Sequence, residues 1–112
     1  MKRRITKLIE KKNIKVNDKY LLNELLDKLE VESLNLLYQI IEYLIKNNYR
    51  FSIGVYETDG DLEQIYFIIH FPSKTQGEEI DKEILKLARY KMSIDKNNLL
   101  WFVGFTCKID HV

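Results

Sequence analysis

The spacing of apolar residues changes at Arg50, and this change constrains the fold more than any other feature of the chain. Before Arg50, apolar residues recur every three or four positions, which is typical of one face of an α-helix. After it, apolar residues occupy every second position over residues 51–56, 64–71 and 99–109, as they do in β-strands with a buried face, with one helical stretch between the last two. The pattern therefore predicts helices first and a sheet afterwards.

Three helices are predicted before Arg50. Their expected bounds are residues 2–12, residues 18–30 after an N-cap at Asn17, and residues 34–46 after an N-cap at Ser33. The third helix is apolar around most of its surface, which is typical of a buried helix. We therefore expect Leu37, Ile41 and Leu44 to be nearly inaccessible.

A hairpin, a fourth helix and a final strand are predicted after Arg50. The expected elements are strands near residues 51–56 and 64–71, a helix opened by a capping box of Thr75 and Glu78, and a strand over residues 99–109. The 112 residues fit one domain, residues 1–112. The predicted class is α+β: three N-terminal helices, a β-hairpin, a helix and a final strand, forming a three-stranded, mainly antiparallel sheet with helices packed on at least one face.

The hairpin loop decides which side chains share a face. A three-residue loop, residues 58–60 with a positive φ at Gly60, places Ile53 opposite Ile65 and Phe51 opposite Phe67. A loop shorter by one residue would put the apolar residues of one strand on the opposite face. The hydrophobic pattern therefore favours the three-residue loop.

The second face of the predicted sheet is too apolar for a face left in water. It carries Ser52, Gly54, Tyr56, Tyr66, Ile68, His70, Phe102, Gly104 and Thr106. Helices on both faces would explain it, with the glycines allowing close packing, and so would a dimer. A third interpretation is a platform on which aromatic rings stack against unpaired bases. The sequence leaves all three open.

Positive charge is concentrated at the N-terminus. The chain has a formal net charge of +1, but residues 1–15 hold seven basic residues and one acid, a net of +6. The basic residues are Lys2, Arg3, Arg4, Lys7, Lys11, Lys12 and Lys15. This charge indicates either a solvated helix surface or contact with phosphates.

Motifs for catalysis, metal binding or cofactor binding are not found in the sequence. The acidic residues at the hairpin tip lack calcium-loop spacing, and neither His70 nor His111 has a second ligand nearby in the sequence. The single cysteine, Cys107, is expected to be buried and inert, in a reducing cytoplasmic compartment. The longest apolar run is far too short to span a membrane, and the narrow apolar side of the first helix argues against binding to a membrane surface.

These observations predict a small non-enzymatic binding protein without a cofactor. Its expected partner is single-stranded or duplex nucleic acid, and the expected contact residues are Lys2, Arg3, Arg4, Lys7, Lys11, Lys12, Tyr56, Tyr66 and Phe102. The alternative is a protein–protein adaptor or regulator whose apolar sheet face is a homodimer or partner interface. In either case we expect a homodimer.

Overall fold

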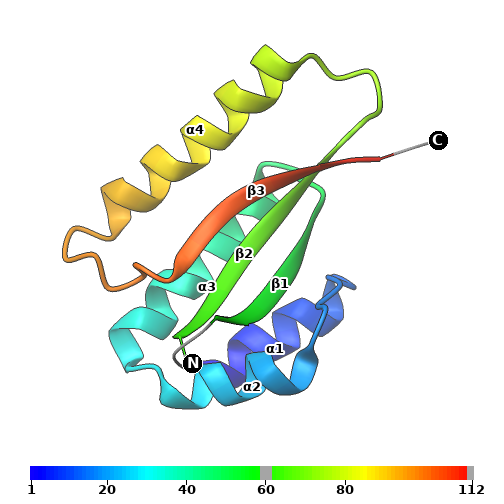
Figure 1. Cartoon of the computed structure of the whole chain (residues 1–112). Coiled ribbons are helices and arrows are strands. Elements are labelled where there is room, and N and C mark those ends of the chain that lie inside the picture. The colour runs from blue at the N-terminus through cyan, green and yellow to red at the C-terminus, as the bar shows by residue number, and fades with distance from the viewer. Residues whose placement is uncertain (59–61, 111–112) are drawn as a thin grey trace.

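The computed structural model describes residues 1–58 and 62–110, with only the backbone of Leu62. Figure 1 shows the elements in chain order: α1 (Lys2–Lys11), α2 (Lys19–Lys28), α3 (Val31–Lys46), β1 (Phe51–Thr58), β2 (Leu62–Phe71), α4 (Gly77–Ile94) and β3 (Val103–Ile109). The α+β class and the order of elements are confirmed. None of the helices in the described part of the chain is long and apolar enough to cross a membrane.

The three strands form one mixed sheet in the order β1-β2-β3. β1 and β2 are antiparallel, while β2 and β3 are parallel. A parallel neighbour requires a crossover connection, and α4 provides it. The sheet thus combines one hairpin with one β–α–β unit.

The hairpin register differs from the predicted one by two residues. Ile53 pairs with Phe67, and Phe51 pairs with Ile69. The predicted faces are nevertheless correct, because a shift by an even number of residues keeps each side chain on its own face. The expected positive φ at Gly60 falls outside the described residues.

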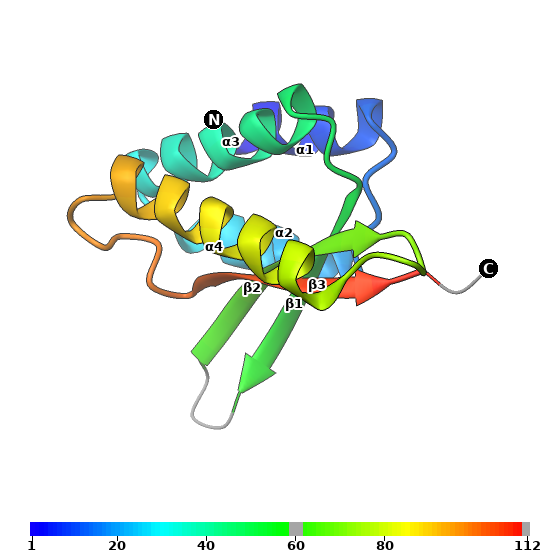
Figure 2. The ribbon, with the colours of Figure 1, turned by 90° about the horizontal axis from the view of Figure 1, so that it is seen from above.

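All four helices lie on one side of the sheet, as Figures 1 and 2 show from two directions. The sheet face beneath them carries the most deeply buried side chains, including Ile65, Phe67 and Ile69, each at most 1% exposed. Leu37, Ile41 and Leu44 of α3 are at most 2% exposed, so α3 is the core helix, as expected. The interpretation that helices cover both faces of the sheet is therefore wrong.

The cap of α2 is Asp18, one residue after the expected cap. Its carboxylate accepts a hydrogen bond of 3.0 Å from the backbone N–H of Leu21. The side chain of Asn17 instead bonds both backbone groups of Val55, at 3.1 and 2.7 Å. Together with a bridge between Val16 and Ile53, this contact covers part of the free edge of β1. The Asn17 side chain therefore makes a tertiary contact with β1 instead of capping α2.

Two other predicted caps are also displaced. α3 begins at Val31 after Glu30, so Ser33 lies inside the helix and is buried. α4 follows Gln76, which makes no side-chain capping bond. The hydroxyl of Thr75 donates to the carbonyl of Pro72 at 2.8 Å, so it closes the preceding turn rather than opening the helix.

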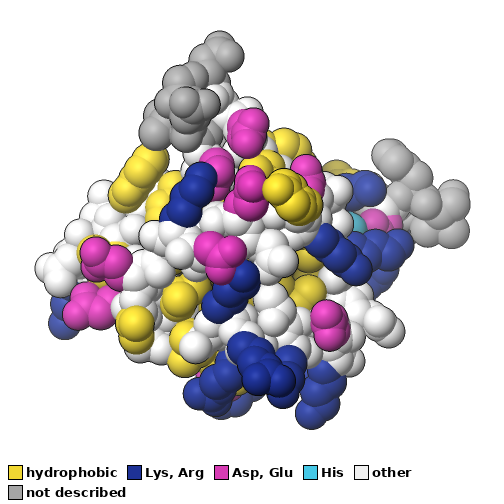
Figure 3. Space-filling model, turned by 90° about the horizontal axis from the view of Figure 1, so that it is seen from below, with side chains coloured by type: hydrophobic (Ala, Val, Ile, Leu, Met, Phe, Trp, Pro, Cys, Tyr) yellow, Lys and Arg dark blue, Asp and Glu magenta, His cyan; other side chains and the backbone are white. Residues whose placement is uncertain are grey.

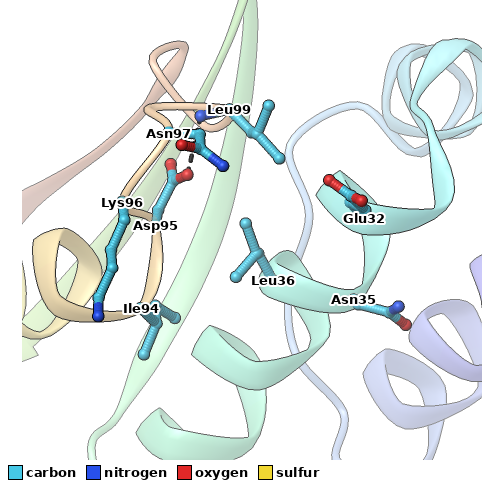
Figure 4. Close-up of a pocket in the computed structure, with 8 residues that line it drawn as sticks. All are labelled: Glu32, Asn35, Leu36, Ile94, Asp95, Lys96, Asn97 and Leu99. Carbon is cyan, nitrogen blue, oxygen red and sulfur yellow. Dashed lines mark hydrogen bonds between the residues drawn. The ribbon is translucent and has the colours of Figure 1, made fainter.

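The last strand begins at Val103, four residues later than predicted. Asp95, only 7% exposed, accepts hydrogen bonds from the backbone N–H groups of Leu99 (2.8 Å) and Leu100 (2.7 Å). These bonds hold the chain before β3 in turns, and Figure 4 shows the one to Leu99. Lys91 donates to the carbonyl of Val103 at 2.6 Å, and burial lowers the pKa of its ammonium. Because Phe102 lies before the strand, the alternation of side chains along a strand does not predict which way its ring points.

Candidate binding surfaces

The basic residues of α1 form one surface with two of its cations already engaged. Lys2 pairs with Asp27 of α2, and the guanidinium of Arg4 lies 4.9 Å from the centre of the Tyr38 ring. The side chains of Arg3, Lys7, Lys11 and Lys12 are exposed. In Figure 3 many of the Lys and Arg side chains gather at the bottom of the view, while others are scattered over the rest of the visible surface. We call these four exposed residues the α1 basic surface.

The spacing of the α1 basic surface follows from the helix. Arg3, Lys7 and Lys11 are four residues apart, so they lie on one line with about 6 Å between successive positions. Ile5 and Ile9, at 0% and 6% exposed, anchor the opposite side of α1 in the core. The helix is therefore held firmly while its cations remain in water.

The second face of the sheet is not covered by helices, and two tyrosines lie on it. The rings of Tyr56 and Tyr66 are 6.0 Å apart at an angle of 57°. A Cβ atom on Gly54 would come within 2.7 Å of the Tyr56 ring, and one on Gly104 within 3.2 Å of the Tyr66 ring. The glycines therefore make room for tyrosine rings, not for helices. We call this side of the sheet the open face.

Phe102 does not belong to the open face. It is 8% exposed and part of the hydrophobic core, while its neighbour Trp101 is 57% exposed. The predicted place of Phe102 on the second sheet face is wrong. β3 starts one residue after Phe102, so strand alternation does not govern the direction of its side chain. The predicted platform of three rings is reduced to two.

The α1 basic surface and the open face lie on opposite sides of the molecule. In Figure 2 the α1 helix lies at the far side of the helix layer, while the sheet forms the other boundary. The nine predicted nucleic-acid contacts are therefore not one continuous site.

Cys107 is exposed, contrary to the expected buried thiol. Residues 106–109 at the end of β3 are all exposed. Alternation predicted the correct face for Cys107, but the helix layer does not cover that face at the end of the edge strand. Whether Cys107 is buried therefore depends on how far the helices extend along β3.

A polar cluster at one end of the open face was missed from the sequence. Ser52 Oγ lies 3.0 Å from His70 Nε2, and His70 Nδ1 lies 3.3 Å from a carboxylate oxygen of Asp110. The other oxygen of Asp110 is 3.3 Å from Arg50. These residues come from both hairpin strands and the end of β3, so no spacing in the sequence signals them.

The order of hydroxyl, imidazole and carboxylate in this cluster is the order used to activate a nucleophile. Ser52 lies within a regular strand, however, and none of the three residues lines any of the three cavities described below. No group of three or more His, Cys, Asp or Glu side chains that could hold a metal ion is found among residues 1–58 and 62–110. The cluster acts as a cross-strand tie between β1, β2 and the chain after β3.

Among the cavities on the described surface, one of about 1070 Å³ is a broad groove between α1 and α2 with apolar and charged walls. A second, about 360 Å³, lies between α3 and the turn after α4, where both carboxylate oxygens of Asp95 are already occupied by backbone N–H groups (Figure 4). A third, about 340 Å³, lies at the end of the sheet near Trp101.

Comparisons with protein-family models, with curated proteins and with solved structures gave no match. The candidate surfaces therefore rest on the geometry of this chain.

Proposed function

We propose that the protein binds nucleic acid through the α1 basic surface, as a binding protein and not an enzyme. The observation that supports this most is the line of exposed cations at Arg3, Lys7 and Lys11 on a helix anchored by a buried apolar side. Cations fixed on a rigid element neutralise phosphates and release their counterions, which drives binding largely independent of base sequence. The lone cysteine supports action in the reducing cytoplasm.

The contact that we propose is with the phosphate backbone rather than with bases. α1 contains no aromatic residue that could stack on a base. Lys2 and Arg4 have partners within the protein, so their contribution is smaller than that of the exposed residues. The proposed site therefore accepts single-stranded and duplex nucleic acid alike.

Reversing two charges of the α1 basic surface tests this proposal. We expect Lys7→Glu with Lys11→Glu to weaken oligonucleotide binding about tenfold and to reduce the salt slope by about 2. The matched control is Lys82→Glu with Lys86→Glu on α4, which has the same charge change and spacing at two exposed positions. Fluorescence anisotropy with labelled single- and double-stranded oligonucleotides at about 50 and 200 mM salt measures both.

The control separates a local site from a general effect of net charge. Equal losses in the two double variants would mean that only overall charge matters. A wild-type protein that does not bind at about 50 mM salt, where phosphate contacts are strongest, would overturn the proposal.

The open face supports a second candidate function, that of a protein–protein adaptor or regulator. Tyr56 is 45% exposed on a sheet face without a helix cover, and exposed aromatic rings are enriched in protein interfaces. A homodimer through this face would leave the α1 basic surfaces of both copies free, because they lie on the opposite side. Base stacking on Tyr56 and Tyr66 is the alternative use of the same face.

Tyr56→Ala distinguishes these uses. An interface predicts that the wild-type dimer shifts toward monomer in sedimentation while oligonucleotide binding is unchanged. Base stacking predicts weaker binding to single strands, with little effect on duplex binding or on the sedimentation of the protein. A monomeric wild type would exclude the homodimer.

A further inference from the structure

A cavity at one end of the sheet brings together an exposed tryptophan, two carboxylates and one ammonium group. Its volume of about 340 Å³ is within the range of small-molecule sites. Glu63 at the start of β2 and Trp101 before β3 form part of its wall, and Lys28 and Glu30 contribute from the end of α2 and the residue before α3. The three ionic side chains carry a net charge of −1.

Glu63 lines this cavity and has one carboxylate oxygen without a hydrogen-bond partner among the described residues. Its side chain is only 10% exposed, and one carboxylate oxygen accepts a 3.0 Å hydrogen bond from Lys28 Nζ. The other oxygen, Oε2, is buried and has no hydrogen-bond partner among the described residues. A buried carboxylate oxygen has lost its water without gaining a donor, which is unfavourable until a donor reaches it.

Lys28 does not supply that donor. Its side chain is 66% exposed and contacts only the first oxygen. The hydrogen bond and the charge of Glu63 raise the pKa of Lys28, so it remains a cation bound to Oε1. Oε2 therefore still lacks a donor among the described residues, and a charged N–H donor would form the stronger bond to a carboxylate.

Trp101 provides a second feature that favours a cation. Its indole is 57% exposed, although Phe102 beside it is buried, and the two rings meet edge to face at 5.7 Å. The face of an indole attracts cations more strongly than other aromatic rings do. Leu29 and Leu99 add apolar wall that can cover an aliphatic stem.

We propose that this cavity binds the ammonium group of an aliphatic amine between the Glu63 carboxylate, rotated so that Oε2 faces the cavity, and the indole of Trp101, with the stem against Leu29 and Leu99. A primary ammonium fits better than a quaternary one, because it has N–H donors for the carboxylate. A free diamine and a lysine side chain of another protein share this chemistry. The site is independent of the α1 basic surface.

Trp101 is the only tryptophan of the chain, so its fluorescence reports on the cavity directly. Titration with n-pentylamine at constant ionic strength should give a saturable change, whereas 1-pentanol, the neutral analogue, should give none. Glu63→Gln should weaken the amine at least about tenfold, because it removes the charge of the acceptor. The matched control Glu78→Gln, at an exposed position in the first turn of α4, should not change the affinity.

Two further ligands separate the sources of the amine. Tighter binding of pentane-1,5-diamine indicates a free polyamine, and tighter binding of N-acetyl-lysine methylamide indicates a lysine side chain. Trp101→Leu, followed by calorimetry, provides a second variant and should weaken the amine several-fold. The absence of a saturable response, an equal response to 1-pentanol, or an unchanged affinity in folded Glu63→Gln would overturn the proposal.

Discussion

The two faces of the sheet differ more in their surroundings than in their side chains. On β2, Ile65, Phe67 and Ile69 point into the helix layer and are at most 1% exposed. The residues between them, Tyr66 and Ile68, are nearly as apolar but remain partly exposed on the open face. Apolar composition therefore made both faces candidates for burial, and the placement of the helices decided which one is buried in the single chain.

The largest expected difference is between two neighbouring isoleucines. Ile69→Ala should cost about 2–5 kcal/mol of unfolding free energy, because it leaves a cavity in the core. Ile68→Ala, the same change on the open face, should cost about 1 kcal/mol or less. Denaturant unfolding of both variants measures the contrast. Equal losses, especially at high protein concentration, would show that the open face is buried by a second copy.

The turn before β3 controls which face Phe102 joins. Asp95→Ala should cost about 2–3 kcal/mol, because one buried and one partly buried backbone N–H group lose a charged acceptor. Asp95→Asn, which keeps one acceptor oxygen, should cost less. Thermal unfolding with Trp101 fluorescence follows both variants. A loss of less than about 0.5 kcal/mol in Asp95→Ala would mean that the turn holds without the carboxylate.

A smaller effect is expected for a polar contact within the helix layer. The hydroxyl of Tyr49 donates to Glu83 of α4. Burial, followed by the hydrogen bond with Glu83, raises the pKa of Tyr49. Tyr49→Phe should cost about 1–2 kcal/mol at neutral pH. Tyr66→Phe, which removes a hydroxyl bonded to Gln64 on the open face, is the comparison and should cost less.

The pH dependence of Tyr49→Phe has a definite sign. The unfolded chain loses the tyrosine proton near pH 10, whereas the folded chain keeps it to higher pH. The stabilisation is therefore present below about pH 10 and is lost as the pH rises toward the folded pKa. Tyr49→Phe should make this alkaline loss shallower without abolishing it, because burial also raises the pKa of Tyr90. An unchanged alkaline profile would contradict this assignment.

Local pattern was sufficient for the elements but not for their ends. The periodicity predicted all four helices and three strands, and it identified Leu37, Ile41 and Leu44 as core. The expected cap at Asn17 failed because a tertiary contact uses the same side chain, as its bonds to Val55 show. The expected cap at Ser33 failed because α3 begins earlier, at Val31. Local propensity does not include such long-range partners.

The candidate sites depended even more on long-range contacts. The basic charge of α1 could be counted in the sequence, but the pairing of Lys2 with Asp27 could not. The cluster of Ser52, His70 and Asp110 joins residues 18 and 40 positions apart. The unused oxygen of Glu63 has no counterpart in any sequence pattern, because it depends on which donors reach a buried carboxylate.

The sequence by itself determined the α+β class, the order of elements and the two sides of each hairpin strand, because these follow from periods of 3.6 and 2 residues along the chain. Only the tertiary structure decided that β3 runs parallel to β2, that the helices share one face and that Phe102 turns inward. These outcomes depend on where α4 and the turn at Asp95 return the chain. Position in space, unlike periodicity, is set by contacts between distant segments.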